Sequence, residues 1–227
     1  MPSDSGFVLP TNVRRLAWSN LAAQSGEQIA LAAAPIVAVL VLEAGAGEIG
    51  LLQTALTLPF LLFAIPAGLM ADRLPRRRLL AGAEMLRALC LLVLLVLVPL
   101  NIVTWPLLAF LGFIAACATV VFSVAAPVLV PSLVPDDLLT TANARIELGR
   151  TTAFAAGPAV GGLLVGWAGA ATAFGVAAIL STLAAALLVG VQEPCRETIA
   201  QRHPIKEIRE GASFVVHHDM LRPVFVT

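Results

Sequence analysis

The sequence has few charged residues, no tyrosine and three cysteines. Charged side chains make up 12% of its 227 residues, whereas soluble domains carry about 25%. Cys90, Cys117 and Cys195 are scattered, without the paired spacing of a zinc site or of a disulfide framework. We therefore expect no metal ion and no cofactor.

Apolar residues dominate the rest of the composition. They account for 59% of the chain, and the mean hydropathy is +0.93. A soluble domain of this size could not bury so much apolar surface without exposing patches that aggregate. The 14 basic and 14 acidic residues cancel, so the net charge gives no indication of a nucleic-acid partner. The composition predicts a protein embedded in a lipid bilayer.

Six apolar stretches are long enough to cross a membrane, which takes about 20 residues of α-helix. None of them alternates apolar with polar residues as the strands of a membrane barrel do. The predicted fold class is therefore an all-α integral membrane protein, a bundle of six transmembrane helices. We place these spans at residues 16–42, 48–70, 79–100, 105–130, 144–166 and 170–191.

Basic residues concentrate at the connections that would lie on one side of the bilayer. They precede the first span, follow the second, open the fifth and follow the sixth. The opposite connections, at 43–48, 99–105 and 167–171, contain no lysine or arginine. By the positive-inside rule, both ends of the chain are predicted to be cytoplasmic, in a multi-pass protein of the cytoplasmic (inner) cell membrane.

The spans divide the chain into four predicted regions. A cytoplasmic tail covers residues 1–15, and the transmembrane domain covers 16–191. The composition then changes abruptly to a polar, amphipathic segment at 192–220, which we predict to be a cytoplasmic interdomain linker. A new apolar run begins at 221–227, and we interpret it as the start of a truncated seventh helix.

An acidic residue lies near the predicted bilayer midplane of the first span. Glu27 follows Arg15 by about 18 Å of helix, at 1.5 Å per residue. Asn20, Gln24 and Gln28 fall on the same side of the helix as Glu27, and such a polar stripe must face a bundle interior or an aqueous cavity. Burial disfavours a charged carboxylate, so we interpret Glu27 as a candidate proton carrier and the stripe as a proton and substrate pathway. The alternative is a neutral Glu27 in a structural hydrogen bond to Gln24 or to a neighbouring span.

The third span carries a second set of charges. Glu84 and Arg87 are three residues apart on one helix face, where opposite charges can pair and lower the cost of burial. Arg87 is the deeper of the two, and we expect it to come within reach of Glu27, which adds it to the predicted pathway. The alternative is a snorkelling pair near the cytoplasmic end of the helix. In the fifth span, solvated or structural roles are predicted for Asn143, Glu147 and Arg150.

The connection between the second and third spans reads Gly-Leu-Met-Ala-Asp-Arg-Leu-Pro-Arg-Arg. It resembles the loop 2–3 signature of the major facilitator superfamily, with Pro75 in place of the second glycine, so that a positive φ is excluded there. The other signature positions are held by Gly68, Asp72, Arg73, Arg76 and Arg77. The resemblance implies a cytoplasmic gate in which these charges bind a second domain. The alternative is a basic anchor that follows the positive-inside rule alone.

The fifth span contains Gly157, Pro158, Gly161 and Gly162. These residues resemble the Gly-Pro-x-x-Gly-Gly motif that marks exporters and antiporters within the same superfamily, although Ala153 stands where a further glycine is usual. Pro158 cannot donate a backbone hydrogen bond, so a bend in the helix is predicted. Small residues at every fourth position also form a ridge that lets another helix approach closely. Packing alone is the alternative explanation.

Shorter segments resemble the branch of the superfamily that contains the siderophore and macrolide exporters. Ser-Gly-Glu at 25–27, the loop at 131–135 and the segment at 208–218 carry this likeness, which spans the whole chain. It implies that the chain is the N-terminal half of a twelve-helix fold, whose missing partner is a C-terminal six-helix half. The fourth span lacks the intramembrane arginine of many drug/proton antiporters, and Arg87 is the candidate substitute.

Together, these resemblances imply a secondary active transporter, a proton-coupled exporter of drug-like or siderophore-like small molecules that works by alternating access. Its expected partners are a small-molecule substrate, protons and the lipid bilayer. The alternative is a truncated or half-size membrane protein that does not transport and acts only through association. An intramembrane enzyme is disfavoured, since the sequence lacks the His-Glu-x-x-His and Gly-x-Ser-x-Gly motifs.

Overall fold

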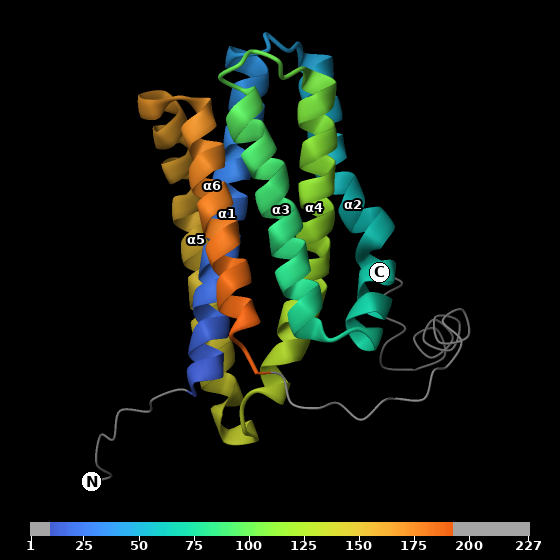
Figure 1. Ribbon diagram of the computed structural model, residues 1–227, viewed down its shortest axis with the longest axis vertical. Coiled ribbons are helices and arrows are strands. Elements are labelled where there is room, and N and C mark those ends of the chain that lie inside the picture. The colour runs from blue at the N-terminus through green and yellow to red at the C-terminus, as the bar shows by residue number, and fades with distance from the viewer. Residues whose placement is uncertain (1–9, 193–227) are drawn as a thin grey trace, which may run out of the picture. The chain divides into compact units, whose positions relative to one another are not determined.

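The computed structural model describes residues 10–192, which form a bundle of six long α-helices (Figure 1). Residues 1–9 of the predicted tail lie outside the described residues, as do the predicted linker after Gln192 and the predicted start of a seventh helix at 221–227. Each of the six helices is long and apolar enough to cross a membrane. The all-α fold class with six membrane-spanning helices, predicted from the sequence, is confirmed.

The helices match the predicted spans, with small shifts at their ends. The first and fifth helices begin five residues earlier than predicted, at 11 against 16 and at 139 against 144. Short 3-10 turns at Val130–Ser132 (η1) and Asp136–Leu138 (η2) connect the fourth helix to the fifth. The six helices are α1 (Thr11–Leu40), α2 (Ala46–Arg73), α3 (Arg76–Leu97), α4 (Trp105–Leu129), α5 (Leu139–Ala168) and α6 (Ala170–Val189).

Two of the connections are very short, and their residues explain why. Leu74 and Pro75 alone separate α2 from α3, and Leu74 is extended, as the residue before a proline prefers to be. Pro75 has a φ of −56°, so this turn needs no glycine where the superfamily signature has one. Gly169 alone separates α5 from α6, with a φ of 86° that glycine adopts without strain.

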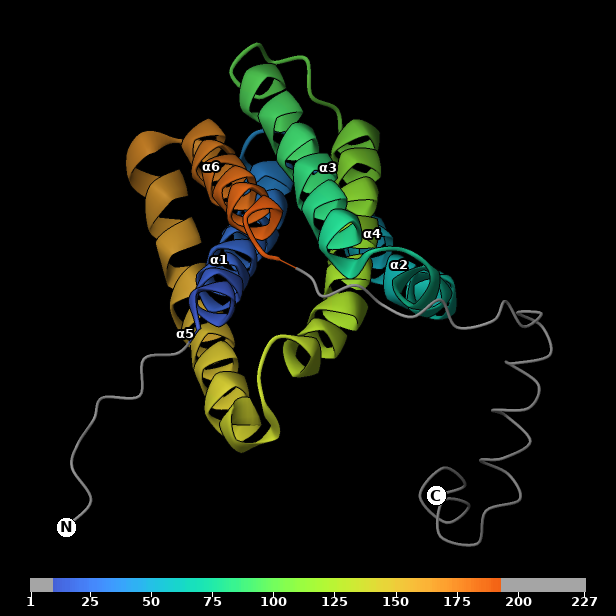
Figure 2. The same ribbon diagram turned by 60° about the horizontal axis from the view of Figure 1, so that its bottom comes forward.

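The helices pack in two groups of three. α1 contacts α5 and α6, while α4 contacts α2 and α3, and the contact between α3 and α6 joins the groups. Figure 2 shows α1, α5 and α6 on one side and α2, α3 and α4 on the other. Gly26 permits a close crossing of α1 and α6, because a Cβ there would lie 3.0 Å from the Ala177 carbonyl oxygen and 3.5 Å from the Ser181 hydroxyl.

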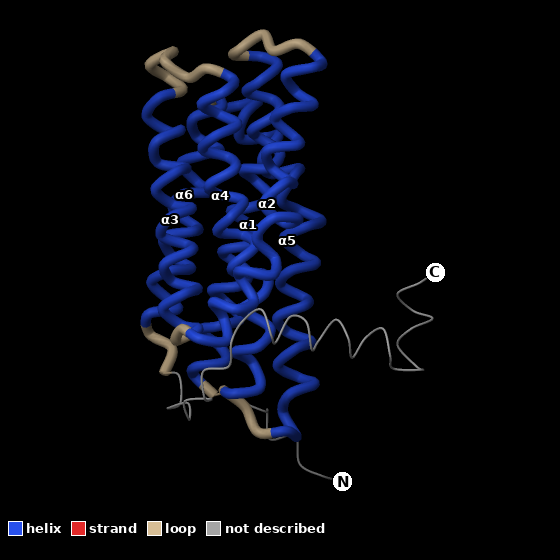
Figure 3. Tube along the Cα trace, turned by 90° about the vertical axis from the view of Figure 1, so that its right-hand side faces the viewer, coloured by secondary structure: helices blue, strands red, loops and turns tan. Residues whose placement is uncertain are grey.

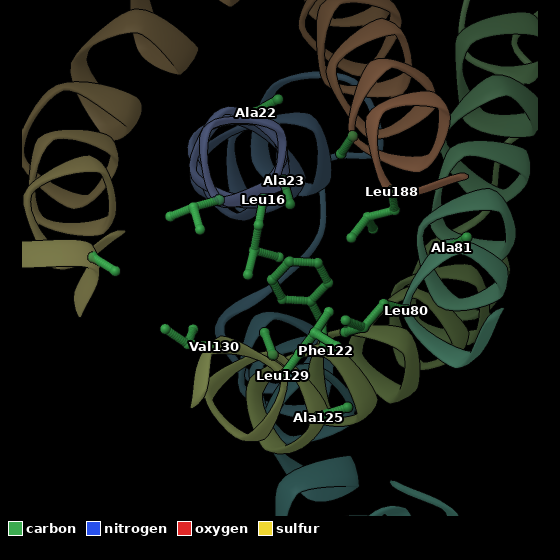
Figure 4. Close-up of a cluster of buried hydrophobic side chains, with 14 of the residues drawn as sticks. Leu16, Ala22, Ala23, Leu80, Ala81, Phe122, Ala125, Leu129, Val130 and Leu188 are labelled. Carbon is green, nitrogen blue, oxygen red and sulfur yellow. The ribbon is translucent and has the colours of Figure 1, made fainter. Parts of the chain in front are cut away.

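Two buried apolar clusters lie toward opposite ends of the bundle, where the connections between helices are also gathered (Figure 3). One cluster includes Phe122 and Leu188 (Figure 4). It lies near the end that holds the α2–α3 and α4–α5 connections, since Ala71, Leu80 and Val134 also belong to it. The other includes Phe174, near the opposite end. Between them, Glu84 and Arg87 are buried. A buried pair of charged residues on α3 therefore lies between the two apolar clusters.

Candidate functional site

A buried arginine on α3 joins three helices. Arg87 is 2% exposed, and it forms ion pairs with Glu84 at 2.9 Å and with Glu27 of α1 at 3.8 Å. Its guanidinium also donates hydrogen bonds to the Thr119 hydroxyl of α4 at 2.8 Å and to the Ala23 carbonyl of α1 at 3.3 Å. We call Glu27, Glu84, Arg87 and Thr119 the charge cluster.

Helical spacing places Glu84 one turn before Arg87, and the bundle buries both side chains. Glu84 is fully buried, and the Ser181 hydroxyl of α6 lies near its carboxylate. The Arg87 side chain is 3% exposed, so Arg87 is not a snorkelling residue, and the predicted approach of Arg87 to Glu27 is present. The burial of Arg87 and Glu84 is tolerated because the two opposite charges lie side by side.

A cavity of about 330 Å³ lies on one side of the charge cluster, toward the end with the α1–α2 connection. Residues of α1, α2, α3 and α4 form most of its wall, and Phe60 and Phe174 supply its aromatic rings. Its charged side chains are Glu27 and Arg87. Because aliphatic and aromatic side chains make up most of the wall, we call it the apolar cavity.

A second cavity, of about 710 Å³, lies toward the end with the α4–α5 connection, between α1, α4 and α5. Several polar side chains border it, so we call it the polar cavity. They include the ion pair of Glu147 and Arg150, whose side chains are 58% and 48% exposed, in agreement with the predicted solvated role. The other polar residues of this wall include Asn20, Gln24, Ser123 and Asn143.

Glu27 and Thr119 border both cavities. The Glu27 side chain is 14% exposed, whereas the Glu84 side chain is 0% exposed and borders neither cavity. The α1 helix thus places one carboxylate group at the boundary between two cavities that extend toward opposite ends of the bundle.

The predicted polar stripe of α1 divides between two surroundings. Asn20 and Gln24 border the polar cavity together with Glu27. Gln28 is also buried, but it borders neither cavity. It packs against α5 instead, where a Cβ on Gly157 would overlap the Gln28 side chain. The structure therefore places Gln28 in the contact between α1 and α5, away from the predicted pathway.

The predicted small-residue ridge of α5 packs against α1. A Cβ on Gly161 would lie 3.0 Å from both the Ala32 Cβ and the Ile29 carbonyl oxygen, so this crossing requires glycine. A Cβ on Gly162, by contrast, would meet open space. The helix continues through Pro158 without interruption, and the bend expected there stays a prediction.

The charged residues of the loop 2–3 signature differ in their surroundings. Arg76 is buried, and it donates a hydrogen bond of 2.8 Å to a carbonyl oxygen near the end of α4. Arg77 donates to the carbonyl of Val191, just after α6, at 3.2 Å. These two arginines therefore tie α3 to α4 and α6 within this bundle. Asp72 and Arg73 are exposed at the end of α2.

Sequence reasoning did not identify Thr119 and Ser181 as members of the site. Each lies in the middle of a helix that is otherwise almost entirely apolar. An isolated hydroxyl at that depth usually hydrogen-bonds to a neighbouring helix, and this is the signal that could have found them. Across residues 10–192, no group of three or more His, Cys, Asp or Glu side chains is placed to hold a metal ion.

These features define a multi-pass α-helical membrane protein in which buried charges lie between two cavities. Residues 9–227 match the transmembrane secretion effector family. The chain belongs to this family and so to the major facilitator superfamily, which confirms the resemblance to the superfamily found in its sequence. A comparison with curated proteins finds no match.

Proposed function

We propose that the chain forms the N-terminal half of a proton-coupled exporter of drug-like or siderophore-like small molecules. The observation that carries this proposal is the position of Glu27, a partly exposed carboxylate that borders both cavities and lies 3.8 Å from the buried Arg87. Secondary transporters hold substrate and coupling ions near the middle of the membrane and open that site to each side in turn. Membership of a superfamily of transporters supports this function.

Glu27 acts in this mechanism by changing its charge. A proton enters through the cavity that is open to the outside, binds Glu27, and leaves through the other cavity after the two halves of the transporter rock. The substrate moves in the opposite direction. The positive-inside orientation makes the polar cavity, beside the arginine-rich connections, the one that opens to the cytoplasm.

The apolar cavity sets the class of substrate. Its wall is mostly aliphatic and aromatic, and Gln53 and Thr57 of α2 add polar groups. A pocket of this kind binds an amphipathic molecule by apolar contact, while a few polar side chains fix its orientation. Drug-like molecules and siderophores with apolar parts fit this description.

Two surfaces of the bundle are assigned to contacts with a C-terminal six-helix half. Asp72 and Arg73 are exposed at the end of α2 that we predict to be cytoplasmic, and charge-assisted hydrogen bonds between these two side chains and the second half would close the gate. Arg76 and Arg77 support this gate by fixing the start of α3 to α4 and α6. Pro158 lies on the exposed face of α5, where we place the moving contact between the halves.

The test of this function is Glu27→Gln in the full-length gene product. Substrates are first identified by a growth screen against a panel of drugs and siderophores. In inside-out membrane vesicles energised by a proton gradient, we expect the variant to lose uptake of these substrates while it still inserts into the membrane. Unchanged uptake would remove Glu27 from the mechanism.

Glu147→Gln is the matched control. Glu147 is also an acid that borders the polar cavity, but its side chain is 58% exposed and it pairs with Arg150 on its own helix. We expect this variant to transport at the wild-type rate, because no buried charge depends on Glu147.

The length of the gene product separates this proposal from a half-size protein that acts only through association. Six further membrane spans encoded beyond residue 227 would support the two-half transporter. A coding sequence that stops there, together with an absence of substrate uptake, would support the alternative.

A further inference from the structure

The charge cluster contains two carboxylates for one guanidinium. Arginine stays protonated in proteins, so the cluster has a net negative charge when Glu27 and Glu84 are both ionised. An unbalanced charge is costly in the interior of a membrane protein. Neutrality therefore requires one proton, on Glu27 or on Glu84.

The two acids differ in their access to the cavities. Glu84 is 0% exposed and borders neither cavity, whereas Glu27 is 14% exposed and borders both. Within the cluster, Glu27 is therefore the acid that can exchange a proton directly with water in a cavity.

The guanidinium of Arg87 is held on the side of Glu84. Its Nη1 lies 2.9 Å from a Glu84 oxygen and donates to the Ala23 carbonyl. Its Nη2 donates to Thr119 at 2.8 Å and stays 3.8 Å from the nearest Glu27 oxygen, beyond hydrogen-bond distance. Glu84, the fully buried acid, thus has the shorter contact with the shared cation, and Glu27, the acid that borders the cavities, has the longer one.

Other charged groups near α1 do not compete for Glu27. α4 and α6 contain no charged residue within their bounds, and the charges of α2 lie close to its two ends. On α5, Glu147 and Arg150 border the polar cavity with Glu27 but pair with each other, and Arg145 does not border it. Cys90 also borders the apolar cavity, but its thiol is neutral and is not a counter-charge for Glu27. Among residues 10–192, Arg87 is therefore the cation that acts on Glu27.

We infer that Glu84 is a positioning residue: it holds Arg87 away from Glu27, so that Glu27 can bind and release a proton. The inference rests on the proposed role of Glu27 as the proton-exchanging acid. When the charge of Glu84 is removed, Arg87 turns wholly toward Glu27 and keeps that carboxylate ionised. Each acid removed singly still leaves Arg87 with one partner, so Glu84→Gln is expected to fold.

The test measures proton binding to Glu27. In the purified full-length protein, infrared difference spectroscopy follows the C=O band of protonated carboxyl groups as the pH is varied, and the band lost in Glu27→Gln belongs to Glu27. In Glu84→Gln, we expect this band to disappear at a pH lower by about one unit or more, because a nearby opposite charge favours ionisation by that amount. Glu147→Gln is the control, and in this variant we expect the Glu27 band to disappear at the same pH as in the wild type.

An unchanged band in Glu84→Gln would overturn the inference. The double variant Glu84→Gln/Arg87→Gln provides a second test, because it removes both members of the buried pair and leaves no unbalanced charge while Glu27 is protonated. Glu27 then has no cation beside it, and we expect its band to persist to a higher pH than in the wild type. A shift to lower pH in the double variant would also overturn the inference.

The infrared measurement and the uptake measurement fail independently. If Glu27→Gln transports normally while the band shifts as expected, the proposed function is wrong and the role of Glu84 stands. If the band of Glu27 ignores Glu84 while uptake still depends on Glu27, the inference is wrong and the proposed function stands.

Discussion

A glutamate followed three residues later by an arginine occurs on two helices of this bundle, in opposite surroundings. The side chains of Glu84 and Arg87 on α3 are 0% and 3% exposed, and the arginine reaches on to Glu27. Those of Glu147 and Arg150 on α5 are 58% and 48% exposed, and they pair with each other. The three-residue spacing brings the two side chains of each pair together, whereas burial determines how much the ion pair contributes to the stability of the fold.

The largest difference between the two pairs should appear in the free energy of unfolding when the arginine of each pair is removed. Arg87→Gln leaves the fully buried Glu84 and the largely buried Glu27 without a counter-charge, and we expect it to lower the free energy of unfolding by about 3–5 kcal/mol. Arg150→Gln leaves only an exposed acid, and exposed ion pairs contribute little to stability, so we expect no measurable change. Thermal unfolding in detergent, followed by circular dichroism, measures both variants. Equal losses would contradict the distinction between the pairs.

The packing of α5 against α1 keeps the exposed pair beside the polar cavity, and it can be tested at two neighbouring glycines. Gly161→Leu would collide with the backbone carbonyl of Ile29, which cannot move aside, and we expect a loss of about 2–3 kcal/mol from overpacking. Gly162→Leu meets open space within the described residues and should unfold like the wild type. The same unfolding measurement applies, and a similar loss at both glycines would argue against a ridge that packs on α1.

A smaller effect is expected where a hydroxyl meets the buried pair. Thr119→Val keeps the shape of the side chain but removes an acceptor of Arg87, and we expect a loss of about 1–2 kcal/mol. Ser123→Ala, one turn further along α4, removes a hydroxyl that bonds to the Val120 carbonyl of its own helix, and it should have little effect. Chemical unfolding of the two variants checks this, and a larger loss at Ser123 would reverse the assignment.

The sequence could predict the six spans because apolar helices of this length have few other solutions in a protein of this composition. It could predict that Glu84 and Arg87 meet, since both lie on one face of one helix. The contact of Arg87 with Glu27 was an expectation only, and the contact with Thr119 was not foreseen. Both depend on which helices are neighbours, and α4, which is apolar almost all round, also carries little signal of its rotation.

The loop 2–3 arginines show another limit of sequence reasoning. The superfamily signature predicts a gate to a second domain, and Asp72 and Arg73 remain candidates for it. Arg76 and Arg77 instead donate to carbonyl groups at the ends of α4 and α6. Every residue carries a backbone carbonyl, so nothing in the sequence indicates which of them an arginine will bind. The surroundings of Gln28 could not be predicted either, because its position on the polar stripe of α1 does not indicate that Gly157 of α5 packs against it.

The end of α6 is stabilised by other helices. No basic residue lies in its last turn, where a cation would normally balance the negative end of the helix dipole. Arg15 of α1 and Arg77 of α3 supply donors instead, to the carbonyls of Gly190 and Val191. The short stretch just after α6, at 190–191, is therefore fastened to both α1 and α3. A mechanical pull on this stretch would be shared among α1, α3 and α6, so that the three helices resist together before the last turn of α6 can unwind.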